Sequence, residues 1–160
     1  MIVVFLGRLQ ARNHLRLAHV VGGLAIVREG GLWVVTGAVA GAVELGADAI
    51  MVSNHGGRQL DGGRSPFDQL DEIVQTVGGQ IEIILDGGIQ RGTHVLKALA
   101  LGATACSGGR MYLYALGAAG RLGVEKALNN FRTEIERDMK LMGVKTIKEL
   151  NSSMVRYRKS

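Results

Sequence analysis

The sequence has one cysteine, one proline and few aromatic residues in 160 positions. Cys106 alone cannot form an internal disulfide, so a secreted disulfide framework is excluded and we expect a reducing, cytoplasmic location. Aromatic residues make up only 4% of the chain, which leaves few stacking platforms for single-stranded nucleic acid. The apolar run at residues 2–6 is too short for a signal peptide, and no run reaches the ~18 residues of a membrane span. We therefore expect neither a nucleic-acid partner nor a membrane span.

Glycine, in contrast, is abundant, with 24 residues that gather in pairs after apolar runs. Such pairs indicate tight turns where the backbone approaches another group closely. The net charge of +5 is spread along the chain, so it does not form a basic tract. A small phosphate-bearing molecule explains the local basic residues as well as an acidic partner would. Pairs of this kind occur at 56–57, 62–63, 87–88 and 108–109, among others.

From about residue 33 onward, short apolar runs alternate with amphipathic stretches, which predicts an α/β fold with a parallel sheet. We predict strands at 33–35, 49–52, 81–85 and 104–107, and helices at 38–45, 66–77, 93–101 and 124–142, with a short one from 146. Residues 1–32 show no regular period and stay unassigned, so the predicted α/β unit covers 33–160. A complete (β/α)₈ barrel takes about 250 residues, so this chain could supply little more than half of one.

Two helices have clear sequence signals. Ser65, Pro66 and Asp68 have the pattern of an N-cap, a first helical position and an acidic first turn. The helix at 124–142 has one apolar face, after which Gly143 provides a stop. The residues expected on that face are Val124, Ala127, Leu128, Phe131, Ile135, Met139 and Met142.

The loop after the strand at 49–52 carries a histidine and an arginine three residues apart, with glycines between them. His55 is of the type most used as a general base, and the guanidinium of Arg58 matches a carboxylate bidentately. Together they could hold a carboxylic acid and remove a proton from its neighbouring carbon or hydroxyl. An isolated His-x-x-Arg is more often a glycine-rich turn whose histidine satisfies backbone groups.

The full eleven-residue run from Val52 to Gly62 is more specific, because it resembles the signature of the FMN-dependent α-hydroxy-acid dehydrogenases and oxidases. This family includes lactate oxidase, glycolate oxidase and mandelate dehydrogenase. The resemblance implies a flavoprotein oxidoreductase that oxidises a small L-2-hydroxy acid to the 2-keto acid with FMN. It also implies that His55 is the catalytic base, that Arg58 binds the substrate carboxylate and that Ser53 contacts the flavin. The implied fold is a partial TIM barrel, its carboxy-terminal half of about four βα units plus terminal helices.

Two further loops follow predicted strands and have the glycine and arginine content of anion sites. The first resembles the FMN-phosphate loop of the same family, and the second resembles the Gly-Arg pair that follows the last barrel strand. Phosphate sites built from the loops after strands seven and eight are a recurrent barrel feature. The cofactor residues implied in these two loops are Asp86, Gly87, Gly88, Ile89, Gln90, Arg91, Gly109 and Arg110.

The resemblance fails at three points. The family has a flavin-contacting lysine on an upstream strand, and residues 31–36 contain none. Gln90 stands where the family has arginine; Arg91 follows, but a shift of one residue at a helix start turns a side chain by about 100°. The first four βα units have no counterpart in residues 1–37. An isolated half barrel would leave an apolar interior uncovered, so we expect a homo-oligomer or a requirement for a complementary half.

Two alternatives stay open. The chain could be a catalytically inactive fragment that retains at most FMN or phosphate binding, or a barrel enzyme that acts on phosphorylated substrates without flavin. The His55 and Arg58 loop argues against the second. No spacing among His14, His19 and His94 suggests a metal site, so we expect no metal.

Overall fold

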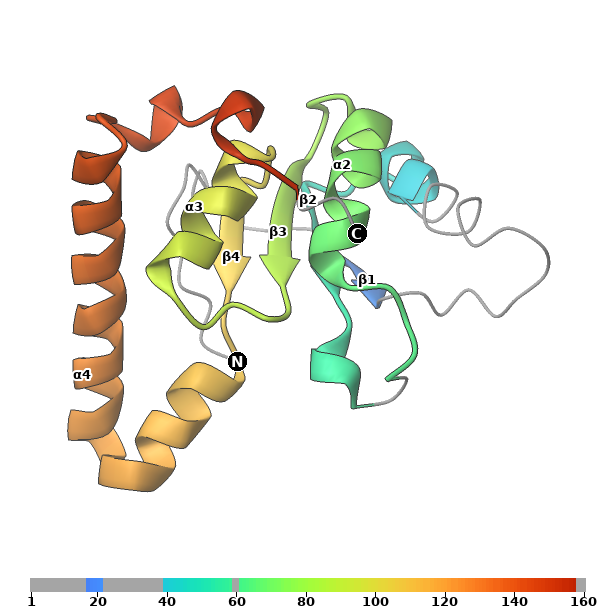
Figure 1. Ribbon diagram of the computed structural model, residues 1–160. Coiled ribbons are helices and arrows are strands. Elements are labelled where there is room, and N and C mark those ends of the chain that lie inside the picture. The colour runs from blue at the N-terminus through green and yellow to red at the C-terminus, as the bar shows by residue number, and fades with distance from the viewer. Residues whose placement is uncertain (1–16, 22–38, 59–60, 158–160) are drawn as a thin grey trace.

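The computed structural model of the protein describes residues 17–21, 39–58 and 61–157. Strands and helices alternate along these ranges (Figure 1). Residues 39–44 are helical as well. The elements are β1 (Leu17–Val21), β2 (Ala49–Ser53), η1 (His55–Gly57), α2 (Pro66–Val77), β3 (Glu82–Asp86), α3 (Gly92–Ala100), β4 (Ala105–Ser107), α4 (Arg110–Leu141), η2 (Ile147–Glu149) and η3 (Ser152–Met154).

The four strands form one parallel sheet in the order β1-β2-β3-β4, which is also their order along the chain. α2 returns the chain from β2 to β3, and α3 returns it from β3 to β4. Successive parallel neighbours joined by single helices are the arrangement of a barrel wall. The predicted α/β fold with a parallel sheet is therefore confirmed, and the strand ends that face a ligand in such folds lie at one edge.

The two faces of the sheet have different neighbours, as the period of two along a strand requires. Ile50 and Val52 of β2 belong to the main core with the helices. Met51, between them, packs with Ile84 and Ala105 on the other face. These three side chains are at most 1% exposed. The apolar side chains at these positions of the second face are therefore buried.

α2 begins and ends where its sequence predicts. The Ser65 hydroxyl accepts the N–H of Asp68 at 3.2 Å, and Pro66 occupies the first turn. Gly78 follows in the left-handed region with φ of 57°, which only glycine adopts without strain. The buried face of the helix packs on β2 and β3, and it consists of Pro66, Gln69, Leu70, Ile73 and Val77.

α4 is longer than predicted, since it begins at Arg110 rather than near residue 124. Its backbone is kinked at Ala119 and Gly120, where the sequence is glycine-rich and gives no clear helical signal. Beyond the kink the helix lies alongside α3 (Figure 1). Phe131 and Ile135 are buried as predicted, but Met142 is 41% exposed. The prediction for Met142 was wrong because α4 ends at Leu141 and the chain turns away there.

β1 is the largest departure from the sequence prediction, because it lies within residues 1–32, which showed no regular period. It pairs with β2 in parallel register, Leu17 opposite Ala49 and Val21 opposite Ser53. The strand predicted at 33–35 lies outside the described residues. In the ranges that the structure describes, no helix combines the length and the apolar content needed to cross a bilayer.

Candidate functional site

The carboxyl ends of three neighbouring strands carry polar residues at one level. Ser53, Asp86 and Ser107 are consecutive register partners on β2, β3 and β4. By alternation they lie on the same face as Met51 and Ile84, one step nearer the end of the strands. Ser53 and Ser107 are fully buried. The sequence thus places a polar layer over a small apolar one at the edge where parallel sheets bind ligands.

The loop after β2 is fixed by its own side chains. The Ser53 hydroxyl accepts the backbone N–H of His55 at 3.0 Å, and Asn54 Oδ1 accepts that of Gly56 at 2.9 Å. His55 has φ of 50°, a left-handed conformation that is uncommon for residues other than glycine. The side chains of His55 and Arg58 are both exposed. The backbone of the loop is therefore held while its two ionisable side chains stay accessible.

The loop after β3 turns through two glycines in the left-handed region, Gly87 with φ of 132° and Gly88 with φ of 71°. His94, in the first turn of α3, reaches back to this loop. Its Nδ1 lies 3.0 Å from the carbonyl oxygen of Gly88 and 3.2 Å from the backbone nitrogen of Gln90. Sequence reasoning considered His94 only as a possible metal ligand and did not predict this contact.

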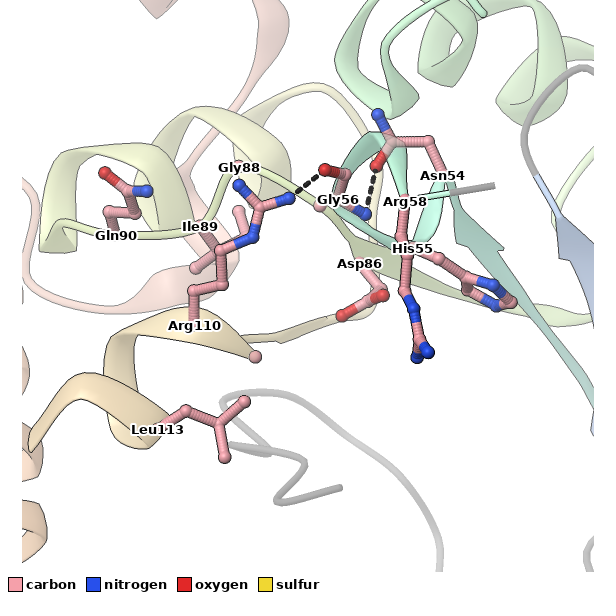
Figure 2. Close-up of a pocket in the computed structure, with 12 residues that line it drawn as sticks. Asn54, His55, Gly56, Arg58, Asp86, Gly88, Ile89, Gln90, Arg110 and Leu113 are labelled. Carbon is pink, nitrogen blue, oxygen red and sulfur yellow. Dashed lines mark hydrogen bonds between the residues drawn. The ribbon is translucent and has the colours of Figure 1, made fainter. Parts of the chain in front are cut away.

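The loop after β4 brings Arg110 back over the first loop. Arg110 Nη2 donates a hydrogen bond to the carbonyl oxygen of Gly56, so residues 54 positions apart are in contact (Figure 2). Within the described ranges neither Arg110 nor Arg58 forms an ion pair with a carboxylate. Both guanidinium groups are consequently available to an anion.

The three loops enclose one cavity of about 660 Å³. Figure 2 shows Gln90 and Arg110 toward one end in that view and Arg58 and His55 toward the other, with Asp86 between them. The imidazole of His55 points away from Arg110. Two arginines and one histidine against a single carboxylate favour an anionic ligand. The lining residues are Asn54, His55, Gly56, Arg58, Asp86, Gly87, Gly88, Ile89, Gln90, Gly109, Arg110 and Leu113.

Two of the residues implied by the family resemblance do not line the cavity. Ser53 is buried, and its hydroxyl donates to Asp86 Oδ2 at 2.5 Å. Arg91 forms an ion pair with Glu134 of α4 at 2.7 Å. That hydrogen-bonded pair lowers the pKa of Glu134 and raises the pKa of Arg91. The guanidinium that follows Gln90 is therefore directed to α4 rather than to the cavity.

The cavity has the features that a phosphate group requires. The backbone N–H groups of Gly88 and Ile89 donate to no acceptor among the described residues, and Arg110 lies beside them. A Cβ atom added at Gly88 or Gly109 would meet nothing within 4 Å, so there is open space at both turns. Asp86 adds an acceptor for hydroxyl groups. No cluster of three metal-ligating side chains occurs in the part of the chain described.

Comparison with protein families agrees with these features. The family model for FMN-dependent dehydrogenases matches residues 35–157. A peroxisomal (S)-2-hydroxyacid oxidase of Arabidopsis thaliana is 50% identical over 115 residues, which are 72% of this chain and 32% of the relative. An L-lactate oxidase of Lactobacillus jensenii is 45% identical over 115 residues, 72% of this chain and 28% of the relative. The chain thus spans about a third of the length of the curated relatives it matches.

Solved structures give the same result. A chimera of (S)-mandelate dehydrogenase superposes with a TM-score of 0.78 and 32% identity, over 91% of this chain and 37% of the chimera. A flavocytochrome b2 variant with sulfite bound gives a TM-score of 0.71 and 46% identity, over 74% of this chain and 32% of the other. The parallel sheet described above is accordingly a section of the (β/α)₈ barrel that these FMN-dependent enzymes share.

Proposed function

This chain belongs to the FMN-dependent dehydrogenase family. From that premise we propose that it supplies the general base, the carboxylate-binding arginine and the phosphate-binding groups for oxidation of a small L-2-hydroxy acid to the 2-keto acid. One observation carries the proposal: His55 and Arg58 line the same cavity as Gly88 and Arg110. The groups suited to a hydroxy acid and those suited to a phosphate therefore meet in one space.

The phosphate of FMN would be held by Arg110 and by the N–H groups of Gly88 and Ile89. A guanidinium and backbone N–H groups at a glycine turn are the usual donors for such a group. Asp86 lies between the two ends of the cavity in Figure 2, where its carboxylate would accept hydrogen bonds from the ribityl hydroxyls. Gln90 provides only neutral hydrogen bonds, so Arg110 supplies the cationic charge at this end.

Arg58 would bind the carboxylate of the hydroxy acid through two parallel N–H···O bonds, which fixes the orientation of the substrate. His55 would take up one proton of the alcohol function as it becomes a carbonyl. Bound FMN supplies the two-electron acceptor for this oxidation. The hydrogen bond from His55 N–H to Ser53 and the positive φ of His55 fix the backbone position from which its imidazole extends.

The experiment is a flavin titration followed by reduction. Purified chain is mixed with FMN, freed of unbound flavin and scanned in the visible range. L-lactate, glycolate or mandelate is then added without oxygen. Bleaching of the retained flavin by one of these acids supports the proposal and identifies the substrate. His55→Gln should retain the flavin and lose the bleaching, whereas Arg110→Gln should lose the flavin itself. Retained flavin that no 2-hydroxy acid reduces would contradict the catalytic role.

The length of the match favours a second function, in which the chain binds FMN or phosphate but does not catalyse the oxidation. The chain spans about a third of its curated relatives, and contacts made by the rest of those proteins are outside it. In that case the flavin titration succeeds and the bleaching fails for the isolated chain. Recovery of bleaching on addition of the preceding part of a relative would assign the defect to the missing contacts.

The association state belongs to the same proposal, because we expect a homo-oligomer or a complementary half of the barrel. The first turns of α4 support this, since they present apolar side chains to solvent: Leu113 is 51% exposed, Tyr114 68% and Leu116 49%. Exposed apolar groups that lie together favour association. Light scattering during size-exclusion chromatography would give the mass. A chain that is a strict monomer, and that stays one when the preceding part of a relative is added, would contradict the expectation.

The cytoplasmic location stays a prediction. The Arabidopsis relatives named as peroxisomal show that the family also works elsewhere. Imaging of a tagged chain in its native cell would decide between the two compartments.

A further inference from the structure

Glu134 of α4 contacts the start of α3 with both of its carboxylate oxygens. Oε2 accepts the backbone N–H of Gly92 at 2.7 Å, and Oε1 pairs with Nη2 of Arg91 at 2.7 Å. The Glu134 side chain is only 18% exposed. Charge-assisted bonds of this length are among the stronger polar contacts in proteins. One carboxylate therefore joins α4 to the start of α3, through residues that are 42 positions apart in the chain.

Gly92 makes this contact possible by its lack of a side chain. A Cβ atom at residue 92 would lie 2.7 Å from the Cβ of Glu134 and 2.8 Å from the backbone nitrogen of Ile135. No real Cβ approaches that closely, so α3 and α4 are in backbone contact at this point. Phe131 and Ile135 are buried beside it. The start of α3 is thereby fixed by packing as well as by hydrogen bonds.

The segment between β3 and Gly92 is short, residues 87–91, and it contains the two N–H groups that suit a phosphate. One end continues from β3, which is paired on both sides in the sheet. The other end is the residue that Glu134 binds. His94 links the middle of the segment to the first turn of α3. The orientation of the Gly88 and Ile89 N–H groups thus depends on where α3 begins.

The charge of Glu134 has a second effect. The first turn of a helix attracts anions through its free N–H groups, and here a carboxylate of the chain already occupies that position. The same carboxylate engages Arg91, the cation nearest to it in the segment. A phosphate in the cavity is therefore left with the donors nearer β3, on Gly88 and Ile89, and with Arg110.

We propose that Glu134 is a positioning residue for the cofactor phosphate, which fixes residues 87–90 through Gly92 and holds Arg91 out of the cavity. The inference rests on the proposed function, since it takes the bound anion to be the phosphate of FMN. Glu134 itself does not line the cavity. Its effect should consequently appear in the binding of the phosphate and not in the binding of the flavin ring.

The test compares FMN with riboflavin, which has the ring and the ribityl chain but no phosphate. Fluorescence titration gives both dissociation constants for the wild-type chain and for Glu134→Ala. We expect FMN to bind about tenfold more weakly to the variant, as for loss of one charge-assisted hydrogen bond, with riboflavin changed less than about twofold. A loss shared equally by FMN and riboflavin, or no loss for either, would overturn the proposal.

Three further variants separate positioning from other effects. Glu136→Ala is the matched control, because the Glu136 side chain is 53% exposed and pairs with Arg132 on the same helix; we expect no change in the ratio of the two constants. Glu134→Gln keeps an acceptor for the Gly92 N–H and should recover most of the FMN affinity. Arg91→Gln should leave FMN binding unchanged. A loss in Arg91→Gln as large as in Arg110→Gln would show that Arg91 binds the phosphate, against the proposal.

Amide hydrogen exchange of the flavin-free chain tests the positioning role if the wild-type chain binds neither FMN nor riboflavin. That result would refute the proposed function for the isolated chain but not the positioning role. Glu134→Ala should then still speed exchange of the hydrogen-bonded amides of Gln90 and Gly92 by about tenfold. Exchange in β3 should not change, and Glu136→Ala should exchange like wild type. Exchange that is uniform between the variants, or raised across the whole chain, would overturn the positioning role. Should Glu134→Ala fail to fold, Glu134→Asp, whose carboxylate is one methylene group further from both donors, should give the same changes at smaller size.

Discussion

Ser53 Oγ donates a 2.5 Å hydrogen bond to Asp86 Oδ2, and the two residues are register partners at the ends of β2 and β3. The same oxygen accepts the backbone N–H of His55 at 3.0 Å. One buried hydroxyl thus connects the carboxylate of the second loop with the loop that carries the imidazole. The family resemblance implies a direct flavin contact for Ser53, and its observed partners add a supporting role for both loops.

Ser53→Ala should therefore destabilise the chain. The substitution removes the donor to a partly buried carboxylate and the acceptor of a backbone N–H. Hydrogen bonds to charged groups contribute about 1.5–3 kcal/mol, so we expect a loss of about 2 kcal/mol in the free energy of unfolding, measured by urea denaturation.

Ser107→Ala is the matched control for that substitution. Ser107 is the register partner of Asp86 on β4 and is equally buried, but its hydroxyl has no hydrogen-bond partner among the described residues. Removal of an unsatisfied buried hydroxyl should be neutral or stabilise the chain by up to about 1 kcal/mol. Equal losses in the two alanine variants would show that burial, and not the bond to Asp86, accounts for the effect of Ser53.

The two glycines after β3 should respond differently to alanine. Both have positive φ, but a Cβ at Gly87 would lie 2.8 Å from Pro66 Cγ and 2.9 Å from Asn54 Oδ1, whereas one at Gly88 would meet nothing within 4 Å. Gly88→Ala should cost about 1 kcal/mol for the backbone alone. Gly87→Ala should cost about 2–4 kcal/mol, since steric overlap is added. Thermal or urea unfolding of both variants measures the difference, and a larger cost at Gly88 would contradict the structure.

Much of the fold could be predicted from the sequence because its elements have strong local signals. The run of apolar residues at 49–52 and the Ser65 cap are such signals, and β2 and α2 formed where they predicted. β1 has no such signal. Its sequence, LAHVV, is short and interrupted by a histidine, and its strand state depends on parallel pairing with residues 32 positions later. Pairing at such a distance leaves no periodic pattern in a single sequence.

The candidate site divides in the same way. The glycine and arginine loops were recognisable as possible anion sites, and nine of the site residues that the family resemblance implies line one cavity. The ion pair of Arg91 was not predictable, because its partner Glu134 lies 43 positions away on another helix. The contact of His94 with Gly88 also required the turn between them to be known. Local sequence indicates which groups are present, and packing between elements decides which of them meet.

Cys106 should be inert in the folded chain. Burial in the main core raises the pKa of its thiol to about 12, from a usual value of 9.0. A thiol reagent at pH ~8 should therefore react only through unfolding, because the thiolate is the nucleophile, and the reaction rate should follow urea concentration.

The raised pKa also means that the folded state favours the protonated thiol. This contribution to stability is present below pH 9.0 and is lost as the pH rises toward 12. Cys106→Ala should remove that part of the alkaline dependence, and rapid labelling of the native chain would contradict the burial.

The ion pair of Glu134 gives a pH dependence of the opposite sense. Hydrogen bonds from Arg91 and from the Gly92 N–H lower the pKa of Glu134 below its usual value of 4.5. A carboxyl group whose pKa is lowered by folding stabilises the folded state above its unfolded pKa, and this contribution is lost as the pH falls through the folded pKa. Glu134→Gln should therefore be less stable than wild type at pH ~7, and the difference should shrink as the pH falls below 4.5 and through the folded pKa of Glu134. Urea midpoints measured across that range give the difference. Glu136→Gln, from the exposed pair with Arg132, should show a smaller difference because solvent screens that pair. A constant gap between Glu134→Gln and wild type at every pH would mean that the carboxylate acts through its shape and not through its charge.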